Sequence, residues 1–142
     1  MRNRIRAASV LTAVFVPIGV LAVSSAPASA AATVTIGQPS LVNKVLVNVS
    51  VSVVCDIGPG ANLNGQVTVT QASGKQLHSA TIGFGGSSVN CDGVTPQVFH
   101  VQVVGGPFTH GKAVISAGGS AAIYTYPYTS EPFSSGVIAT KL

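Results

Sequence analysis

The sequence predicts an all-β protein, an immunoglobulin-like antiparallel β-sandwich of seven or eight strands with one disulfide. Three observations lead to this prediction. Apolar and polar residues alternate over several short segments, glycine and proline separate these segments, and no stretch has a helical period of useful length. With 142 residues, of which 46% are apolar and only 7% are charged, the chain suits one globular domain with one core.

Residues 1–30 have the three parts of a secretory signal peptide. Arginines stand at positions 2, 4 and 6, an apolar run follows over 7–23, and the segment ends in Ala28-Ser29-Ala30, an A-x-A cleavage site. Pro17 and Gly19 interrupt the apolar run, so it is too short to be a transmembrane anchor. We therefore expect residues 31–142 to form a secreted, extracellular domain with no membrane attachment after cleavage of the signal peptide.

The formal charge of +4 also belongs mostly to that first segment, which holds the three arginines. Residues 31–142 contain four lysines, two aspartates and one glutamate, a formal charge of +1. A nearly neutral domain gives no electrostatic footprint for nucleic acid, so nucleic acid is not an expected partner.

The chain has two cysteines, Cys55 and Cys91. Outside the cytoplasm such a pair is expected to oxidise, and two cysteines allow only one intramolecular disulfide. Their spacing matches none of the usual zinc-ligand patterns, so we expect neither a metal site nor a cofactor.

The strands can be assigned in order from the alternation. The longest is predicted over 45–55, where every odd position is apolar and Cys55 continues the buried row. Gly58-Pro59-Gly60 is predicted to be the turn that ends this strand. The other expected strands are 33–36, 66–70, 77–84, 99–103, 113–117, 122–128 and 133–141. Turns are expected at Ser73-Gly74, which would make a hairpin, at Gly105-Gly106-Pro107, and at Gly118-Gly119.

Catalytic chemistry has only one candidate in this sequence. Asp56 and Asp92 each follow a cysteine, so a disulfide would bring their carboxyl groups together as a possible glycosidic acid–base pair. The alternative is that Asp92-Gly93 makes a turn and that Asp56 ends a strand in water. The three histidines lack metal-ligand spacing, and no serine lies in a nucleophile motif. We expect no enzymatic activity and no catalytic residues.

Three tyrosines form the only pattern that points to a ligand. Tyr124, Tyr126 and Tyr128 are spaced by two, which on an extended strand places three rings on one face. Such a row can stack against sugar rings or flat apolar ligands. Alternatively, the rings cover an edge of the sandwich, and Pro127 keeps that edge from pairing with another chain.

Short motifs across the region after the signal peptide carry a resemblance. They are Thr33-Val34-Thr35, Cys91-Asp92-Gly93, and the run of residues 107–113, Pro-Phe-Thr-His-Gly-Lys-Ala. In these motifs the chain resembles small secreted actinobacterial single-disulfide β-sandwich domains of unknown function. In size, export and fold class it also resembles the neocarzinostatin-like chromophore-binding sandwiches, which have two disulfides where this chain has cysteines for one. The first resemblance implies an extracytoplasmic sandwich without an established activity.

The sequence therefore favours an exported, non-catalytic binding or structural module that acts at or outside the cell surface. The candidate ligand-binding residues are the three tyrosines, and the candidate partner is cell-wall material or polysaccharide. Two alternatives remain: a small-ligand carrier sandwich, and a weak hydrolase that uses Asp56 and Asp92.

Overall fold

The structure is a computed structural model that describes residues 32–142, so the expected signal peptide lies outside the described residues. These residues form eight antiparallel strands, and they include no helix that could cross a membrane. The strands are β1 (Thr33–Ile36), β2 (Ser40–Asn43), β3 (Leu46–Val54), β4 (Gly58–Ser73), β5 (Gln76–Cys91), β6 (Gln97–Val104), β7 (Lys112–Ile123) and β8 (Thr129–Lys141).

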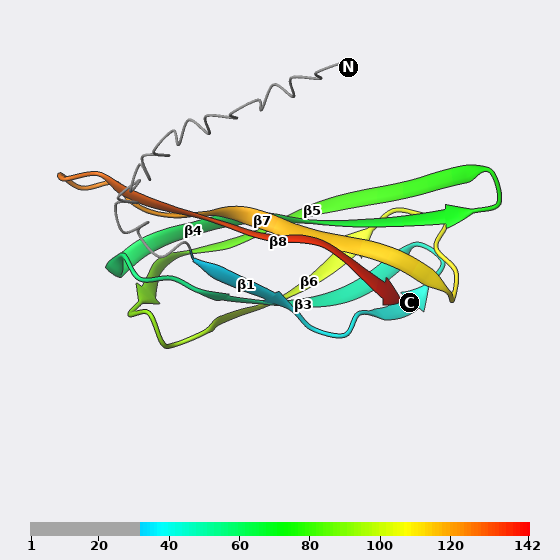
Figure 1. The fold of residues 1–142 in the computed structure, drawn as a ribbon, viewed down its shortest axis with the longest axis horizontal. Coiled ribbons are helices and arrows are strands. Elements are labelled where there is room, and N and C mark those ends of the chain that lie inside the picture. Colours follow the sequence, from blue (N-terminus) through cyan, green and yellow to red (C-terminus); the bar gives the residue numbers. More distant parts are fainter. Residues whose placement is uncertain (1–31) are drawn as a thin grey trace, which may run out of the picture.

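The strands pack as two layers, which Figure 1 shows edge-on. In one layer β3 is central: β1 and then β2 pair along one side of it, and β6 pairs along the other. The second layer has the strand order β5-β4-β7-β8. Because the chain changes layer after β3, after β5 and after β6, the connectivity is that of an immunoglobulin-like sandwich. The fold class predicted from the sequence is confirmed.

The inward face of β3 follows the alternation in the sequence. Val47, Val49, Val51 and Val53 are buried, and Cys55 continues the same row. Val45 is an exception, since its side chain is 52% exposed. The side chain of Asn43 accepts a hydrogen bond from the Val45 amide at 2.9 Å, which makes an Asx turn, so β3 begins one residue later than predicted.

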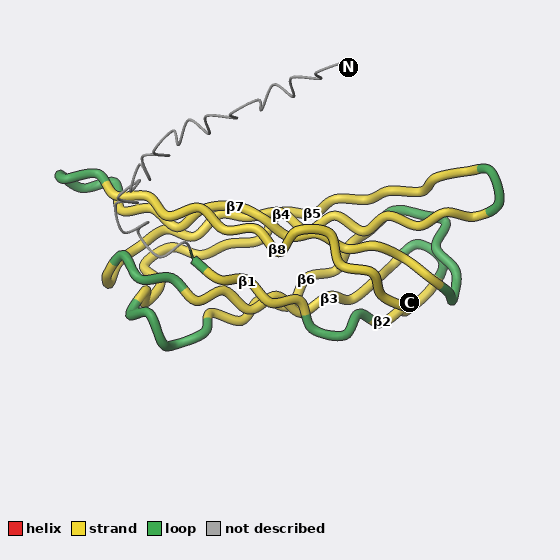
Figure 2. The backbone as a smooth tube through the Cα atoms, in the orientation of Figure 1, coloured by secondary structure: helices red, strands yellow, loops and turns green. Residues whose placement is uncertain are grey.

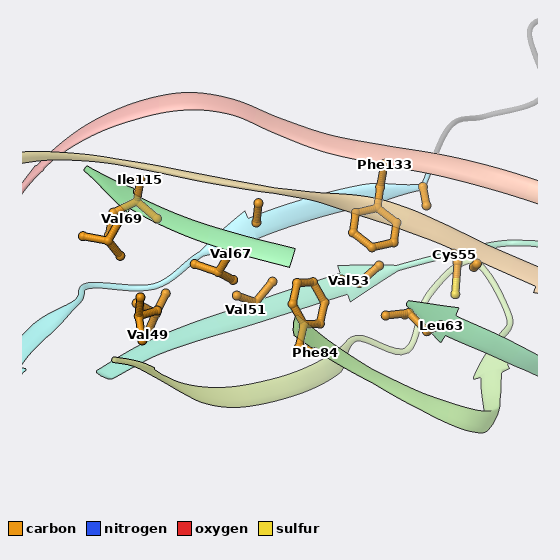
Figure 3. Packing of buried hydrophobic residues seen from close by; sticks show 14 of the residues in the cluster. Val49, Val51, Val53, Cys55, Leu63, Val67, Val69, Phe84, Ile115 and Phe133 are labelled. Carbon is orange, nitrogen blue, oxygen red and sulfur yellow. The ribbon is translucent and has the colours of Figure 1, made fainter. Parts of the chain in front are cut away.

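Aromatic rings fill the middle of the core between the two layers (Figure 3). The ring of Phe84 on β5 lies 5.2 Å from that of Phe99 on β6 and 6.1 Å from that of Phe133 on β8, measured between ring centroids. Valines of β3 and β4 pack beside these rings. The rings therefore join the two sheets by apolar contact.

Two glycine-rich segments that were predicted to be turns lie within strands instead. Gly118-Gly119 is in the middle of β7, where Gly119 pairs with Gly65 of β4. A Cβ atom at Gly65 would lie 2.5 Å from the ring of Phe84, and one at Gly119 would lie 2.1 Å from the carbonyl oxygen of Asn64. Glycine is needed here because the aromatic core and the neighbouring strand leave no space for a side chain.

The second such segment, Gly58-Pro59-Gly60, forms the irregular start of β4 rather than a turn. Gly58 and Gly60 have φ angles of 102° and 80°, and the pairing with β5 shifts register between Pro59 and Ala61. By contrast, the hairpin predicted at Ser73-Gly74 is present, with Gly74 at a φ of 61° in the two-residue connection between β4 and β5.

Candidate functional site

The three tyrosines lie in the loop between β7 and β8 and not in a strand. β7 ends at Ile123, which pairs with Thr129 at the start of β8, so residues 124–128 form the tip of a hairpin. The expected strand over 122–128 is therefore wrong beyond Ile123. Figures 1 and 2 show this loop projecting past the ends of the neighbouring strands, at the opposite end of the molecule from the C-terminus.

The tyrosine side chains are exposed, although they do not form a flat row. Tyr124, Tyr126 and Tyr128 are 69%, 100% and 63% exposed, respectively. The rings of Tyr124 and Tyr128 face each other across the base of the loop, with centroids 5.9 Å apart and planes tilted by 44°. The structure thus brings two of the rings together, and among residues 32–142 it places no aromatic neighbour beside Tyr126 at the tip.

Pro127 belongs to the same loop, so it does not protect a strand edge. The three tyrosine side chains do not cover an edge of the sandwich either, because all of them lie beyond Ile123 and Thr129, the last paired residues of β7 and β8. The side-chain hydroxyl of Thr129 donates to the Pro127 carbonyl oxygen at 3.4 Å, which ties the end of the loop to β8.

The disulfide lies at the same end of the sandwich. Cys55 and Cys91 are bonded with an S–S distance of 2.02 Å, and both are buried. Cys55 follows β3 in one sheet and Cys91 ends β5 in the other, so the bond links the two layers. The predicted pairing is confirmed.

The two aspartates are brought near the disulfide, as expected, but Asp92 is engaged in a turn. Its carboxylate accepts hydrogen bonds from the Val94 amide at 2.9 Å, and from the amide and the hydroxyl of Thr95, each at 2.6 Å. These bonds, chiefly that from the Thr95 side chain, lower the pKa of Asp92 from 3.8 to about 2. The general acid of a glycosidase needs a raised pKa, so this shift runs in the opposite direction.

Asp56 is exposed and lies against the same turn. The carboxyl carbon of Asp56 would be 3.0 Å from a Cβ atom at Gly93, and the Gly93 amide donates to the Cys55 carbonyl oxygen at 2.8 Å. The hydrogen bond fastens the β5–β6 loop beside the disulfide. The turn at Asp92 and the exposed side chain of Asp56 agree with the non-catalytic interpretation of the two aspartates.

Glu131 is a buried acidic residue that the sequence analysis did not identify. Its Oε2 atom accepts a hydrogen bond from the Asp56 amide at 2.9 Å, so it joins β8 to the chain just after the first cysteine. Glu131 is two residues before the buried Phe133 on β8, so both side chains point to the same face of the strand. This spacing could have predicted from the sequence that Glu131 faces the core.

The histidines do not converge. His78 is half-buried on β5, His100 is exposed on the outer face of the other sheet, and His110 is exposed in the loop before β7. Within residues 32–142, no three histidine, cysteine or acidic side chains gather as metal ligands would.

Comparison with known proteins adds little to this geometry. No protein-family model matches the chain, and no curated protein matches it. Among solved structures, it is similar to a putative late embryogenesis abundant protein determined in solution, with 14% identity and a TM-score of 0.45, over 78% of this chain and 71% of that one.

Proposed function

We propose that this chain is an exported, non-catalytic binding module that acts at or outside the cell surface and makes contact through its tyrosine loop, residues 124–128. The observation that carries the proposal is the exposure of three tyrosine side chains on one projecting loop. Export is supported by the composition of residues 1–30 and by the disulfide, which is compatible with an oxidising extracellular compartment.

Aromatic rings of this kind suit a ligand that has apolar faces and polar edges. A tyrosine ring can stack on the C–H face of a sugar, while its hydroxyl forms a hydrogen bond at the rim. Cell-wall material or another polysaccharide presents many such sugars in a repeating array. Each stacked ring contributes on the order of 1 kcal/mol, so the interaction would be weak for one site and stronger on a polymer that binds many copies.

The base of the loop is well held, which favours recognition over disorder. β7 and β8 pair up to Ile123 and Thr129, and Glu131 binds the Asp56 amide two residues further along β8. The disulfide lies at the same end. Loops that rigid strands position in this way are common binding surfaces in sandwich proteins.

The two alternative functions have less support. A hydrolase that used Asp56 and Asp92 would need a carboxyl group that holds a proton near neutral pH, and the pKa of Asp92 is lowered to about 2. A carrier that encloses its ligand between the sheets would need a cavity there, whereas aromatic and valine side chains occupy that region.

The test is a pull-down of the purified domain on isolated cell wall and on insoluble polysaccharides. We expect replacement of Tyr124, Tyr126 and Tyr128 by alanine to remove binding, and replacement of all three by phenylalanine to retain most of it, because stacking needs only the ring. The melting temperature should stay within a few degrees, since the side chains lie outside the core.

The matched control is Val94→Ala, which shortens another exposed apolar side chain in a loop at the same end of the sandwich. It should bind as the wild type does. Equal binding by the triple alanine variant, or its unfolding, would overturn the proposal.

A further inference from the structure

A second candidate binding surface lies away from the tyrosine loop, on the outer face of the β5-β4-β7-β8 sheet. An open hollow of about 860 Å³, within the size range of small-molecule sites, is lined mostly from this face and also by Gln38, from the segment between β1 and β2 of the other layer. It is at the end of the sandwich that carries the β4–β5 hairpin and the C-terminus, on the right in Figure 1. Its apolar lining includes Ala72, Leu77, Val114 and Ala139, which come from four adjacent strands.

The strand register explains why these side chains share one face. Ala72 pairs with Leu77, and Val114 pairs with Ala139. Odd positions of β4 point into the core, so Ala72 points outward, and its neighbours on the other strands point the same way. Leu77 is 71% exposed, which leaves a large apolar side chain open to water.

Lysines flank this apolar surface. Lys112 and Lys141 both line the hollow, and they are direct cross-strand partners at the ends of β7 and β8. Like charges in that position repel each other and destabilise a sheet. A third lysine, Lys75, lies in the hairpin turn two residues before Leu77.

The acidic side chains of the described region are all at the other end. Asp56 and Asp92 adjoin the disulfide, and Glu131 pairs with Ala121, far along β7 from Lys112. Leu142 turns toward the β6–β7 loop, where its oxygen accepts a hydrogen bond from the Gly111 amide at 3.2 Å. Within residues 32–142, no acidic side chain is therefore placed to neutralise the lysine pair.

We propose that this hollow binds a single anionic amphiphile, a molecule with one hydrocarbon chain and an anionic head group. The chain lies on the apolar floor that Leu77 and Val114 provide, and the head group lies between Lys112 and Lys141. A purely hydrophilic anion would leave the apolar floor exposed, and a neutral hydrocarbon would not use the attraction of the two exposed ammonium groups. The bound anion thus offsets a repulsion that the free protein tolerates.

The test is a calorimetric titration of the purified domain with laurate, at low ionic strength and at laurate concentrations below the critical micelle concentration. We expect saturable binding of one molecule per chain, weakened by added salt because part of the attraction is between exposed charges. A neutral amphiphile with the same chain length should bind at least tenfold more weakly.

Two pairs of variants locate the site. Lys141→Gln should weaken laurate binding roughly tenfold, whereas Lys44→Gln, which removes the same charge in the turn between β2 and β3, should not change it. Leu77→Ser should weaken binding to a similar degree, and Val98→Ser, at a 53% exposed valine on the other sheet, should not. Lys141→Gln should also melt no lower than the wild type, because it relieves the repulsion with Lys112.

The proposal is overturned by the absence of laurate binding, by equal losses in a variant and its control, or by equal affinity for the neutral amphiphile. Binding to phosphatidylglycerol vesicles without binding to monomeric laurate would also overturn it, since that result indicates a membrane surface rather than a single chain. The triple alanine variant of the tyrosine loop should bind laurate normally, so failure of one proposal is distinguishable from failure of the other.

Discussion

Gly119→Ala tests how closely the aromatic core and the β4–β7 pair approach each other. A Cβ atom at this position would lie 2.1 Å from the carbonyl oxygen of Asn64, 2.5 Å from the Cα atom of Gly65 and 2.8 Å from the ring of Phe133. The ring can move, but the other two atoms belong to the backbone of β4. The added methyl group can therefore fit only if β7 and β4 separate.

The expected cost follows from that geometry. An added methyl group in a packed core typically costs about 1–3 kcal/mol when side chains can move to make room. Because the clash here is with backbone atoms, we expect the free energy of unfolding to fall by about 3 kcal/mol. For a domain of this size, that free energy corresponds to a fall of about 12 °C in the melting temperature.

Gly83→Ala is the matched control, because it makes the same change in β5, which belongs to the same sheet and lies on the other side of β4. The nearest atom to a Cβ at Gly83 is the carbonyl oxygen of Gly65, at 3.8 Å, which is an ordinary contact. This variant should be neutral, or more stable by up to about 1 kcal/mol through the lower entropy of its unfolded chain. Both variants are measured by thermal and urea unfolding. If Gly119→Ala melts within two or three degrees of Gly83→Ala, the close approach described here is wrong.

Three further predictions concern the disulfide, the long strand and the loop after β5. Replacing Cys55 and Cys91 by alanine reopens a loop with a sequence separation of 36 and should lower the free energy of unfolding by about 4 kcal/mol in urea titrations. Val49→Asp places an unpaired charge in the core and should prevent folding, whereas Ser50→Asp, on the outward phase of the same strand, should leave the circular dichroism spectrum unchanged; similar spectra for the two variants would contradict the face assignment. The lowered pKa of Asp92 means that its carboxylate stabilises the fold above pH 4 and that this contribution is lost as the pH falls toward 2, so Asp92→Asn should melt lower than the wild type at pH 7, and the difference should shrink in acid.

Local pattern was sufficient for the features that depend on one strand or one turn. Alternation identified the inward face of β3, because side chains along any strand point to opposite faces in turn. The Ser73-Gly74 hairpin was also predictable, since a two-residue connection needs a residue that accepts positive φ. The cysteine pairing was predictable because two cysteines allow only one intramolecular disulfide.

Only the tertiary structure decided the features that depend on residues far apart in the sequence. Gly118-Gly119 has the composition of a turn, yet it lies inside β7. Glycine is present there because Phe133 and β4 occupy the space where side chains would be. The tyrosines have the spacing of a strand, but the register between β7 and β8 leaves no partner residues for them, so they form a loop. Lys112 and Lys141 lie far apart in the sequence, and pairing between the ends of β7 and β8 makes them neighbours. A sequence shows which residues share a face of one element, whereas the residues that meet across elements are set by strand order and register, which arise from the packing of the whole core.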